Sequence, residues 1–173
     1  SLSSILSFII FYKVITENYS SVIHLATWIN SGTLNVNWAI KIDALSSIML
    51  VVVCLISSLI HIYSIGYMSH DPHKPRFMSY LSLFTFSMLI LVTSDNFLQL
   101  FFGWEGVGLC SYFLIGFWYK KPSANAAAIK AFIVNRVGDV GLAIGIFLIF
   151  YFFGTLNYAE VFSNTPHYSN KEI

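Results

Sequence analysis

One acidic residue, Glu105, lies near the middle of a long apolar run that contains "FFGWEGVGLC", residues 101–110. No other residue between Phe97 and Trp118 is charged. An isolated carboxylate at the centre of a bilayer costs about 3 kcal/mol on insertion scales, so it is expected to face protein or water and to have a partner. Two interpretations are open: a structural acid hydrogen-bonded to a neighbouring helix, and a site that binds and releases a proton.

The next apolar segment carries charged residues that could partner this acid. The stretch "ANAAAIKAFIVNRVGDVGLAIG", residues 124–145, contains Lys130, Arg136 and Asp139. Arg136 and Asp139 are three positions apart, so they share one helix face and can pair. This pair is open to a structural interpretation, as an internally neutralised ion pair, and to a functional one, as part of a proton path.

Counting from the connection at residues 119–123 places these groups by depth. Glu105 is 13 residues before Trp118 and Arg136 is 12 residues after Ala124, so each lies about 18–20 Å from the turn at 1.5 Å per residue. We therefore expect Glu105, Arg136 and Asp139 at one level near the middle of the membrane. Lys130 is expected about 9 Å from the turn, where it either extends to the interface or joins the path.

The sequence offers no machinery for making or breaking covalent bonds. It has no P-loop, no glycine-rich nucleotide fingerprint after a strand and no cysteine or histidine set with cluster spacing. Cys54 and Cys110 lie in apolar runs and are interpreted as reduced core residues. We assign no catalytic, cofactor-binding or metal-binding residue. A net charge of +1 without a basic stripe argues against nucleic acid as a partner. The remaining chemistry is ion or proton conduction.

The elements that carry these residues are predicted to cross a membrane. The chain has 173 residues, of which 57% are hydrophobic and 10% charged, whereas a soluble domain has about 25% charged residues. A spanning helix needs about 20 mainly apolar residues. The predicted spans are 44–62, 77–92, 96–118 and 124–153, with a shorter partial helix at 1–15. The fold class is therefore an all-α integral membrane protein with about five transmembrane helices, embedded in lipid.

The segments outside these helices complete the predicted organisation. Residues 16–43 are too polar to span and form a loop in which "TLNVNWAIKI" alternates as a short strand or hairpin would. Residues 154–173 form a polar tail, expected to be surface-lying or disordered. The connections 63–76 and 119–123 are basic, which predicts that both face the matrix or cytoplasm. Gly141 and Gly145 have the small-xxx-small spacing of close helix contacts.

Several of these segments together resemble chain 5 of NADH–ubiquinone oxidoreductase, the antiporter-like family of respiratory complex I. They are "HIYSIGYM", "SDNFLQLFFGWEGVGLCSYFLIGFWY", "ANAAAIKAFIVNRVGDVG" and "GTLNYAE". The resemblance implies an antiporter-like helical bundle that takes part in proton translocation coupled to electron transfer from NADH to ubiquinone. The family's central acid corresponds to Glu105, and its other charged positions correspond to Lys130, Arg136 and Asp139.

The resemblance also implies a setting for the chain. NADH, FMN, iron–sulfur clusters and ubiquinone would bind elsewhere in the complex, and this chain would hold no cofactor. The expected location is the mitochondrial inner membrane, beside other membrane-arm subunits. Family members are several hundred residues long and pair the central acid with a lysine on a later helix. We therefore expect a second polypeptide to complete the subunit, or a truncated chain.

Two other functions remain open at this stage. One is a subunit of a multi-subunit cation/proton antiporter, which would share the same helices. The other is a structural remnant that only holds the distal membrane arm together, in which case Glu105 and Asp139 would be replaceable.

Overall fold

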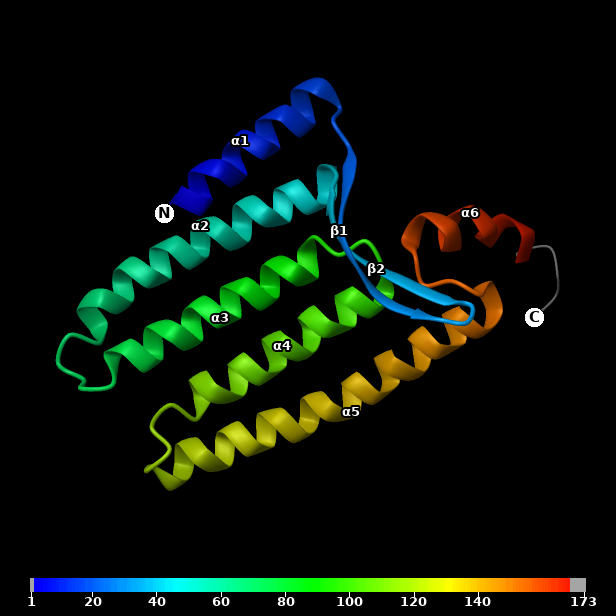
Figure 1. Ribbon diagram of the computed structural model, residues 1–173. Coiled ribbons are helices and arrows are strands. Elements are labelled where there is room, and N and C mark those ends of the chain that lie inside the picture. Colours follow the sequence, from blue (N-terminus) through cyan, green and yellow to red (C-terminus); the bar gives the residue numbers. More distant parts are fainter. Residues whose placement is uncertain (1, 169–173) are drawn as a thin grey trace.

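The computed structural model of the chain describes residues 2–168 and consists of six helices and one hairpin (Figure 1). The elements, in chain order, are α1 (Leu2–Glu17), β1 (Ser21–Ser31), β2 (Leu34–Ile42), α2 (Ala44–Tyr67), α3 (Lys74–Val92), α4 (Phe97–Ile115), α5 (Pro122–Phe153) and α6 (Tyr158–Tyr168). Helices α1 to α5 lie side by side in chain order, and each packs against its neighbours along the chain (Figure 1).

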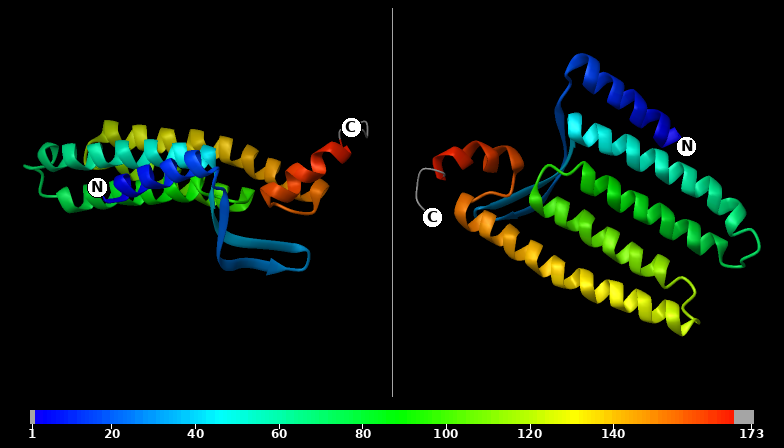
Figure 2. Two further views of the ribbon diagram at one scale, coloured as in Figure 1. Left: turned by 90° about the horizontal axis from the view of Figure 1, so that it is seen from above. Right: turned by 180° about the vertical axis from the view of Figure 1, so that it is seen from behind.

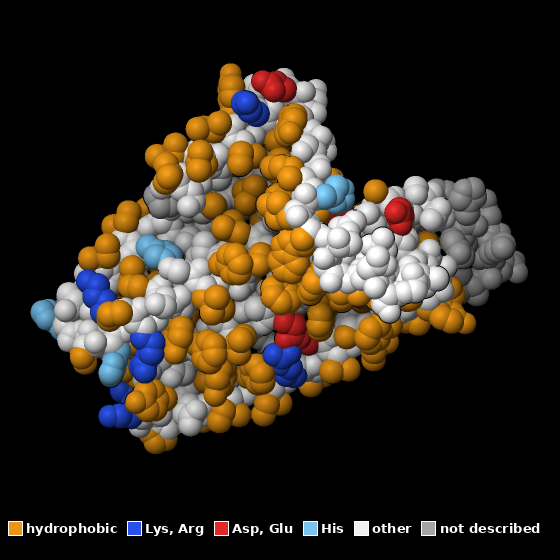
Figure 3. Space-filling view, in the orientation of Figure 1, with side chains coloured by type: hydrophobic (Ala, Val, Ile, Leu, Met, Phe, Trp, Pro, Cys, Tyr) orange, Lys and Arg blue, Asp and Glu red, His pale blue; other side chains and the backbone are white. Residues whose placement is uncertain are grey.

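The prediction of an all-α membrane fold is confirmed. Among the described residues, helices α2, α3, α4 and α5 are long and apolar enough to cross a membrane. The predicted partial helix at the start of the chain forms α1, which has 16 residues. Only 6–17% of the residues in each candidate span are buried within the chain. Apolar side chains cover much of the face seen in Figure 3. These helices therefore present their apolar surfaces to lipid or to other proteins.

Capping residues, a proline and a glycine mark the ends of these helices. Asp43 caps α2: its carboxylate accepts from the Ser46 backbone N–H at 2.8 Å, while the Ser46 hydroxyl is 2.8 Å from the Asp43 N–H. Asn96 caps α4 by accepting from the Gln99 N–H at 2.8 Å. Helix α5 begins at Pro122 and ends at Gly154, whose φ of 70° is a left-handed conformation that favours glycine.

The alternating segment predicted at residues 33–42 is one half of a two-stranded antiparallel hairpin, β1–β2. The hairpin stands away from the layer of helices (Figure 2). The buried Gln99 side chain fastens it to α4, donating to the Ala39 carbonyl at 2.7 Å and accepting from the Ala39 N–H at 3.1 Å. Val36 also packs in a small core with Ile146 and Leu156.

The C-terminal part of the chain differs in part from the expected tail. Residues 158–168 form helix α6 at the same end as the hairpin (Figure 1). The Tyr158 N–H donates to the Asp95 carbonyl at 3.2 Å, and the Tyr158 hydroxyl is 3.1 Å from Ser94 Oγ. These contacts join the start of α6 to the turn between α3 and α4. The last five residues of the predicted tail lie outside the described part of the chain.

The two basic connections lie at one end of the helical layer, as predicted (Figure 1). The Trp118 indole N–H donates to Asp71 Oδ2 at 3.2 Å, and Arg76 Nη2 donates to the Phe117 carbonyl at 3.2 Å. Hydrogen bonds from the His73 backbone N–H and from Trp118 lower the pKa of Asp71. The connections α2–α3 and α4–α5 thus contact each other at one end of the helices.

Candidate functional site

The central acid has a cationic partner on the next helix. The guanidinium Nη1 of Arg136 on α5 donates to the carboxylate Oε2 of Glu105 on α4. The Glu105 side chain is 22% exposed and that of Arg136 is 41% exposed. The guanidinium also lies over the Phe132 ring, 4.5 Å from its centroid. The ion pair is therefore half-sheltered between two adjacent helices.

A second carboxylate completes a three-residue charged cluster. Asp139 lies one turn further along α5, and its Oδ2 is 3.7 Å from Nη1 of Arg136. Its other oxygen, Oδ1, accepts from the Trp104 indole N–H at 2.8 Å. The Asp139 side chain is only 9% exposed. The Arg136 guanidinium therefore lies between two acids, and the neutral Trp104 indole donates a hydrogen bond to Asp139, the more buried of the two.

This geometry agrees with the depth expected from sequence. Glu105, Arg136 and Asp139 come together, as the equal distances from the α4–α5 connection predicted. Figure 3 shows an acidic and a basic patch side by side amid apolar side chains, away from the basic loops. Within residues 2–168, Lys130 forms no salt bridge and belongs to a different level of α5.

Trp104 was not identified as a site residue from the sequence. Its position next to Glu105 offers a signal in retrospect, because an indole N–H inside a membrane needs an acceptor. Asp139 was the available acceptor on the neighbouring helix. The sequence alone did not show that Trp104 turns toward α5, because this depends on how α4 is rotated about its axis.

The rotation of α4 goes with close contacts at two of its glycines. These are not the α5 glycines that have the small-xxx-small spacing. A Cβ added at Gly103 would lie 2.7 Å from the Leu91 backbone nitrogen, and one at Gly106 would lie 2.7 Å from Ser87 Oγ. Helix α4 therefore approaches α3 closely at these glycines. Within the described residues, the expected close contact at Gly141 and Gly145 is not found, because no other helix comes within 4 Å of a Cβ added there.

A groove adjoins the buried acid of the cluster. It has a volume of about 240 Å³ and is lined by Trp104, Gly108, Ser111, Asn135 and Asp139, among others. A space of this size with several polar groups is large enough for water molecules. Within residues 2–168, no group of three His, Cys, Asp or Glu side chains is placed to hold a metal ion.

Comparison with known proteins places the chain in a family. Residues 28–78 match the family model described as NADH-Ubiquinone oxidoreductase (complex I), chain 5 N-terminus, and residues 94–173 match the model NADH:quinone oxidoreductase/Mrp antiporter, TM. Chain 5 of the NADH-ubiquinone oxidoreductase of Chondrus crispus is 56% identical over 169 residues, or 98% of this chain. The chain belongs to the family of NADH-ubiquinone oxidoreductase chain 5. The family's subunit L from Rhodobacter capsulatus is 52% identical over 99% of the chain.

The match covers only part of these relatives. The chain spans 25% of the length of both the Chondrus and the Rhodobacter proteins. Among solved structures, the Mrp complex of Dietzia sp. has a chain that superposes with a TM-score of 0.76 at 24% identity, covering 98% of this chain and 18% of its own length. The archaeal membrane-bound sulfane sulfur reductase gives a TM-score of 0.79 at 18% identity, covering 92% of this chain and 32% of its own. These two structures support the fold.

Proposed function

We propose that this chain contributes to proton translocation in the membrane arm of NADH:ubiquinone oxidoreductase, with Glu105 as a protonatable site. The observation that carries the proposal is the cluster in which Arg136 contacts Glu105 and lies 3.7 Å from Asp139. Buried ionisable residues in transmembrane helices are commonly parts of ion or proton pathways. The names of the family's chain 5 and subunit L relatives support the same assignment.

The cluster suggests how a proton would be taken up. While Arg136 contacts Glu105, the acid is neutralised as a carboxylate. When the guanidinium turns toward Asp139, Glu105 is left in apolar surroundings, which favour the protonated form. The return of Arg136 favours release of the proton. Asp139 provides the alternative position for the cation, and Trp104 holds that carboxylate in place.

We assign Lys130 to the path between the basic loops and this cluster. It is on the same helix as Arg136, six residues nearer the α4–α5 connection, which corresponds to about 9 Å. A lysine at that level could pass a proton or attract an anionic group. Its role is secondary to that of Glu105 in this proposal.

The cellular setting follows from the same assignment. We place the chain in the mitochondrial inner membrane with the two basic connections on the matrix side, as the positive-inside rule favours. Its partners would be other membrane-arm subunits. NADH, FMN, iron–sulfur clusters and ubiquinone would bind to other subunits, and this chain would carry out no redox chemistry.

A second candidate is a subunit of a cation/proton antiporter, which the fold similarity to a chain of the Mrp complex favours. Both functions use the charged cluster. They differ in whether translocation depends on quinone reduction. The structural-remnant alternative differs from both, since it requires no titration of Glu105.

The test is the ratio of protons translocated to electrons transferred in vesicles that contain the native assembly. Glu105→Gln keeps the shape of the side chain but removes its ability to titrate. Glu17→Gln, at the end of α1 and outside the cluster, is the matched control. We expect a lower ratio only for Glu105→Gln. A normal ratio would support the structural-remnant alternative, and translocation without quinone reduction would support the antiporter.

A further inference from the structure

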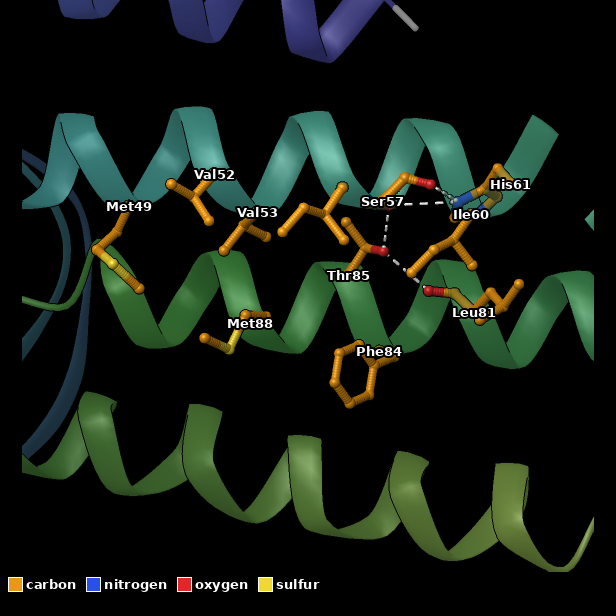
Figure 4. A pocket seen from close by; sticks show the side chains of 11 residues that line it. Met49, Val52, Val53, Ser57, Ile60, His61, Leu81, Phe84, Thr85 and Met88 are labelled. Atoms are coloured by element: carbon orange, nitrogen blue, oxygen red, sulfur yellow. Dashed lines mark hydrogen bonds between the residues drawn. The ribbon is translucent and has the colours of Figure 1, made fainter. Parts of the chain in front are cut away.

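A second polar cluster lies in a groove between α2 and α3, two of the helices that could cross a membrane. The groove has a volume of about 280 Å³, and most of its lining is apolar. Its polar corner contains His61 and Ser57 from α2 and Thr85 from α3 (Figure 4). This cluster is separate from Glu105, Arg136 and Asp139, and the proposed proton path does not use it.

The hydrogen bonds of the hydroxyl groups can be assigned from the carbonyls that accept from them. Thr85 Oγ1 lies 2.9 Å from the Leu81 carbonyl, which can only accept, so the Thr85 hydroxyl donates there. The Ser57 hydroxyl, 2.7 Å from Thr85 Oγ1, must then be the donor of that pair. The Ser82 hydroxyl donates to the Met78 carbonyl at 2.9 Å. Each of the three hydroxyl protons is thus directed away from His61.

Both nitrogens of His61 consequently face acceptors. Nδ1 is 2.7 Å from the Ser57 carbonyl and therefore carries a proton. Nε2 is 3.3 Å from Ser82 Oγ, whose own proton is directed to Met78. When the Ser82 hydroxyl donates to Met78, its oxygen is free to accept a proton carried by Nε2, so the site can satisfy a doubly protonated ring. If the Ser82 hydroxyl rotates toward Nε2, the same site accommodates the neutral ring.

The charged groups on the neighbouring elements do not pair with this histidine. On α3, Lys74 donates to the Ile65 carbonyl at 3.0 Å and Arg76 donates to the Phe117 carbonyl. On α1, Lys13 and Glu17 are in the last turns of the helix, at its hairpin end (Figure 1). On β2, Lys41 pairs with Asp43. Within the described residues, no carboxylate forms an ion pair with His61, and the hydrogen-bond partners of its ring are hydroxyl and carbonyl groups.

We propose that His61, together with Ser57, Ser82 and Thr85, is a second proton-binding site, which takes up protons at the basic-loop side. His61 is six residues before the end of α2 at Tyr67, or about 9 Å from that end. Glu105 is ten residues before the end of α4 at Ile115, or about 15 Å. Water at the loop face would give a proton to Nε2, and reorientation of Ser82 would accompany its release. This inference rests on the proposed function, since it supplies a proton to the same translocation.

The first test observes the histidine directly. The full chain, labelled with ¹⁵N in its histidines, is placed in lipid vesicles and followed by solid-state NMR between about pH 5 and pH 8, the range in which histidines commonly change charge. His61→Gln identifies the signal. We expect a reversible change between one and two protonated ring nitrogens. A ring that keeps one protonated nitrogen throughout would overturn the proposal.

The Ser82→Ala variant tests whether Ser82 contributes to proton binding by His61 or whether the histidine acts alone. It removes the acceptor at Nε2, so the doubly protonated fraction of His61 should fall severalfold relative to the unchanged chain at the same pH. Ser79→Ala, one turn away on α3, removes a hydroxyl that bonds only to the Pro75 carbonyl and serves as the control. Equal fractions in the two variants would contradict the assigned role of Ser82.

The second test uses the native assembly. His61→Gln should lower the initial rate of proton translocation severalfold at unchanged quinone reduction, while His70→Gln in the α2–α3 connection should not. Failure of the two proposals can be distinguished. If Glu105→Gln lowers translocation, but the His61 ring keeps one protonated nitrogen and His61→Gln has no effect, only the proposal for His61 fails. If His61 titrates as described while Glu105→Gln translocates normally, the proposed function of Glu105 fails instead.

Discussion

Arg136 on α5 forms an ion pair with Glu105 on α4, across 31 positions of sequence and two antiparallel helices. The same guanidinium lies 3.7 Å from Asp139. Two acids thus share one cation in an otherwise apolar part of the chain. This arrangement has two possible ion pairs and one excess negative charge, so a single proton can neutralise it. That property distinguishes the cluster from a closed structural salt bridge.

Removing the shared cation should destabilise the helical layer. Arg136→Gln leaves two acids without their counter-ion, and we expect a loss of about 1–3 kcal/mol, less than for a fully buried pair because the side chain is 41% exposed. The double variant Glu105→Gln/Arg136→Gln should recover part of this loss. Thermal unfolding of the native assembly measures both. Additive losses in the double variant would show that the two residues do not interact.

The indole of Trp104 should contribute to the position of Asp139. Trp104→Phe keeps a ring but removes the N–H that donates to Asp139 at 2.8 Å. A hydrogen bond to a charged group contributes about 1.5–3 kcal/mol, so we expect lower thermal stability and slower translocation. Trp118→Phe is the control, because its partner Asp71 lies in an exposed connection. Equal effects of the two variants would argue against a special role for Trp104.

The cap of α2 gives a pH-dependent prediction. Burial acts to raise the pKa of Asp43, but hydrogen bonds from Ser46 and the charge of Lys41 outweigh it and lower the pKa. A lowered folded-state pKa means that the stabilisation is present above the unfolded value, about 3.9, and is lost as pH falls through the folded value. Asp43→Ala should cost about 1 kcal/mol at neutral pH and less in acid.

Hydrogen exchange of the first turn of α2 reports on this cap. Asp43→Asn is the matched variant, since it keeps an acceptor for the Ser46 N–H but not the charge. It should protect the turn nearly as well as Asp43 and without the dependence on pH. An Ala variant that exchanges like the unchanged chain at neutral pH would contradict the capping role.

The ionisation of Asp95 should give the opposite dependence of local stability on pH. Burial raises the pKa of this residue, and the charges of Lys41 and His24 oppose the rise only in part. A raised folded-state pKa means that stabilisation is present below the unfolded value and is lost as pH rises through the folded one. The junction with α6, where the Tyr158 N–H donates to the Asp95 carbonyl, should therefore loosen as pH rises. Exchange of the Tyr158 amide measures this, and Asp95→Asn should abolish the trend.

The level of the charged cluster could be predicted because it depends only on helix rise. Counting residues from the α4–α5 connection placed Glu105 beside Arg136 and Asp139. The rotation of each helix about its axis could not be obtained in this way, since it depends on contacts between helices. For that reason Trp104 was missed, and the close contact was expected at Gly141 and Gly145 instead of at Gly103 and Gly106, which face α3.

Only part of the hairpin, too, could be predicted from the sequence. The period-2 alternation in residues 33–42 predicted β2, in which Val36 and Ala39 are buried. Strand β1 is almost entirely exposed, so its sequence carries no comparable pattern. Its structure depends on pairing with β2, and hence on a contact between segments that local sequence does not specify.

In the proposed function, Glu105 changes its protonation state while the assembly turns over. Infrared difference spectroscopy of the native assembly during quinone reduction detects the C=O stretch of a protonated carboxyl group directly. We expect a band that appears and decays with turnover, shifts with carboxyl isotope labelling and is missing in Glu105→Gln but not in Glu17→Gln. A difference spectrum that is unchanged in Glu105→Gln would contradict the proposed function.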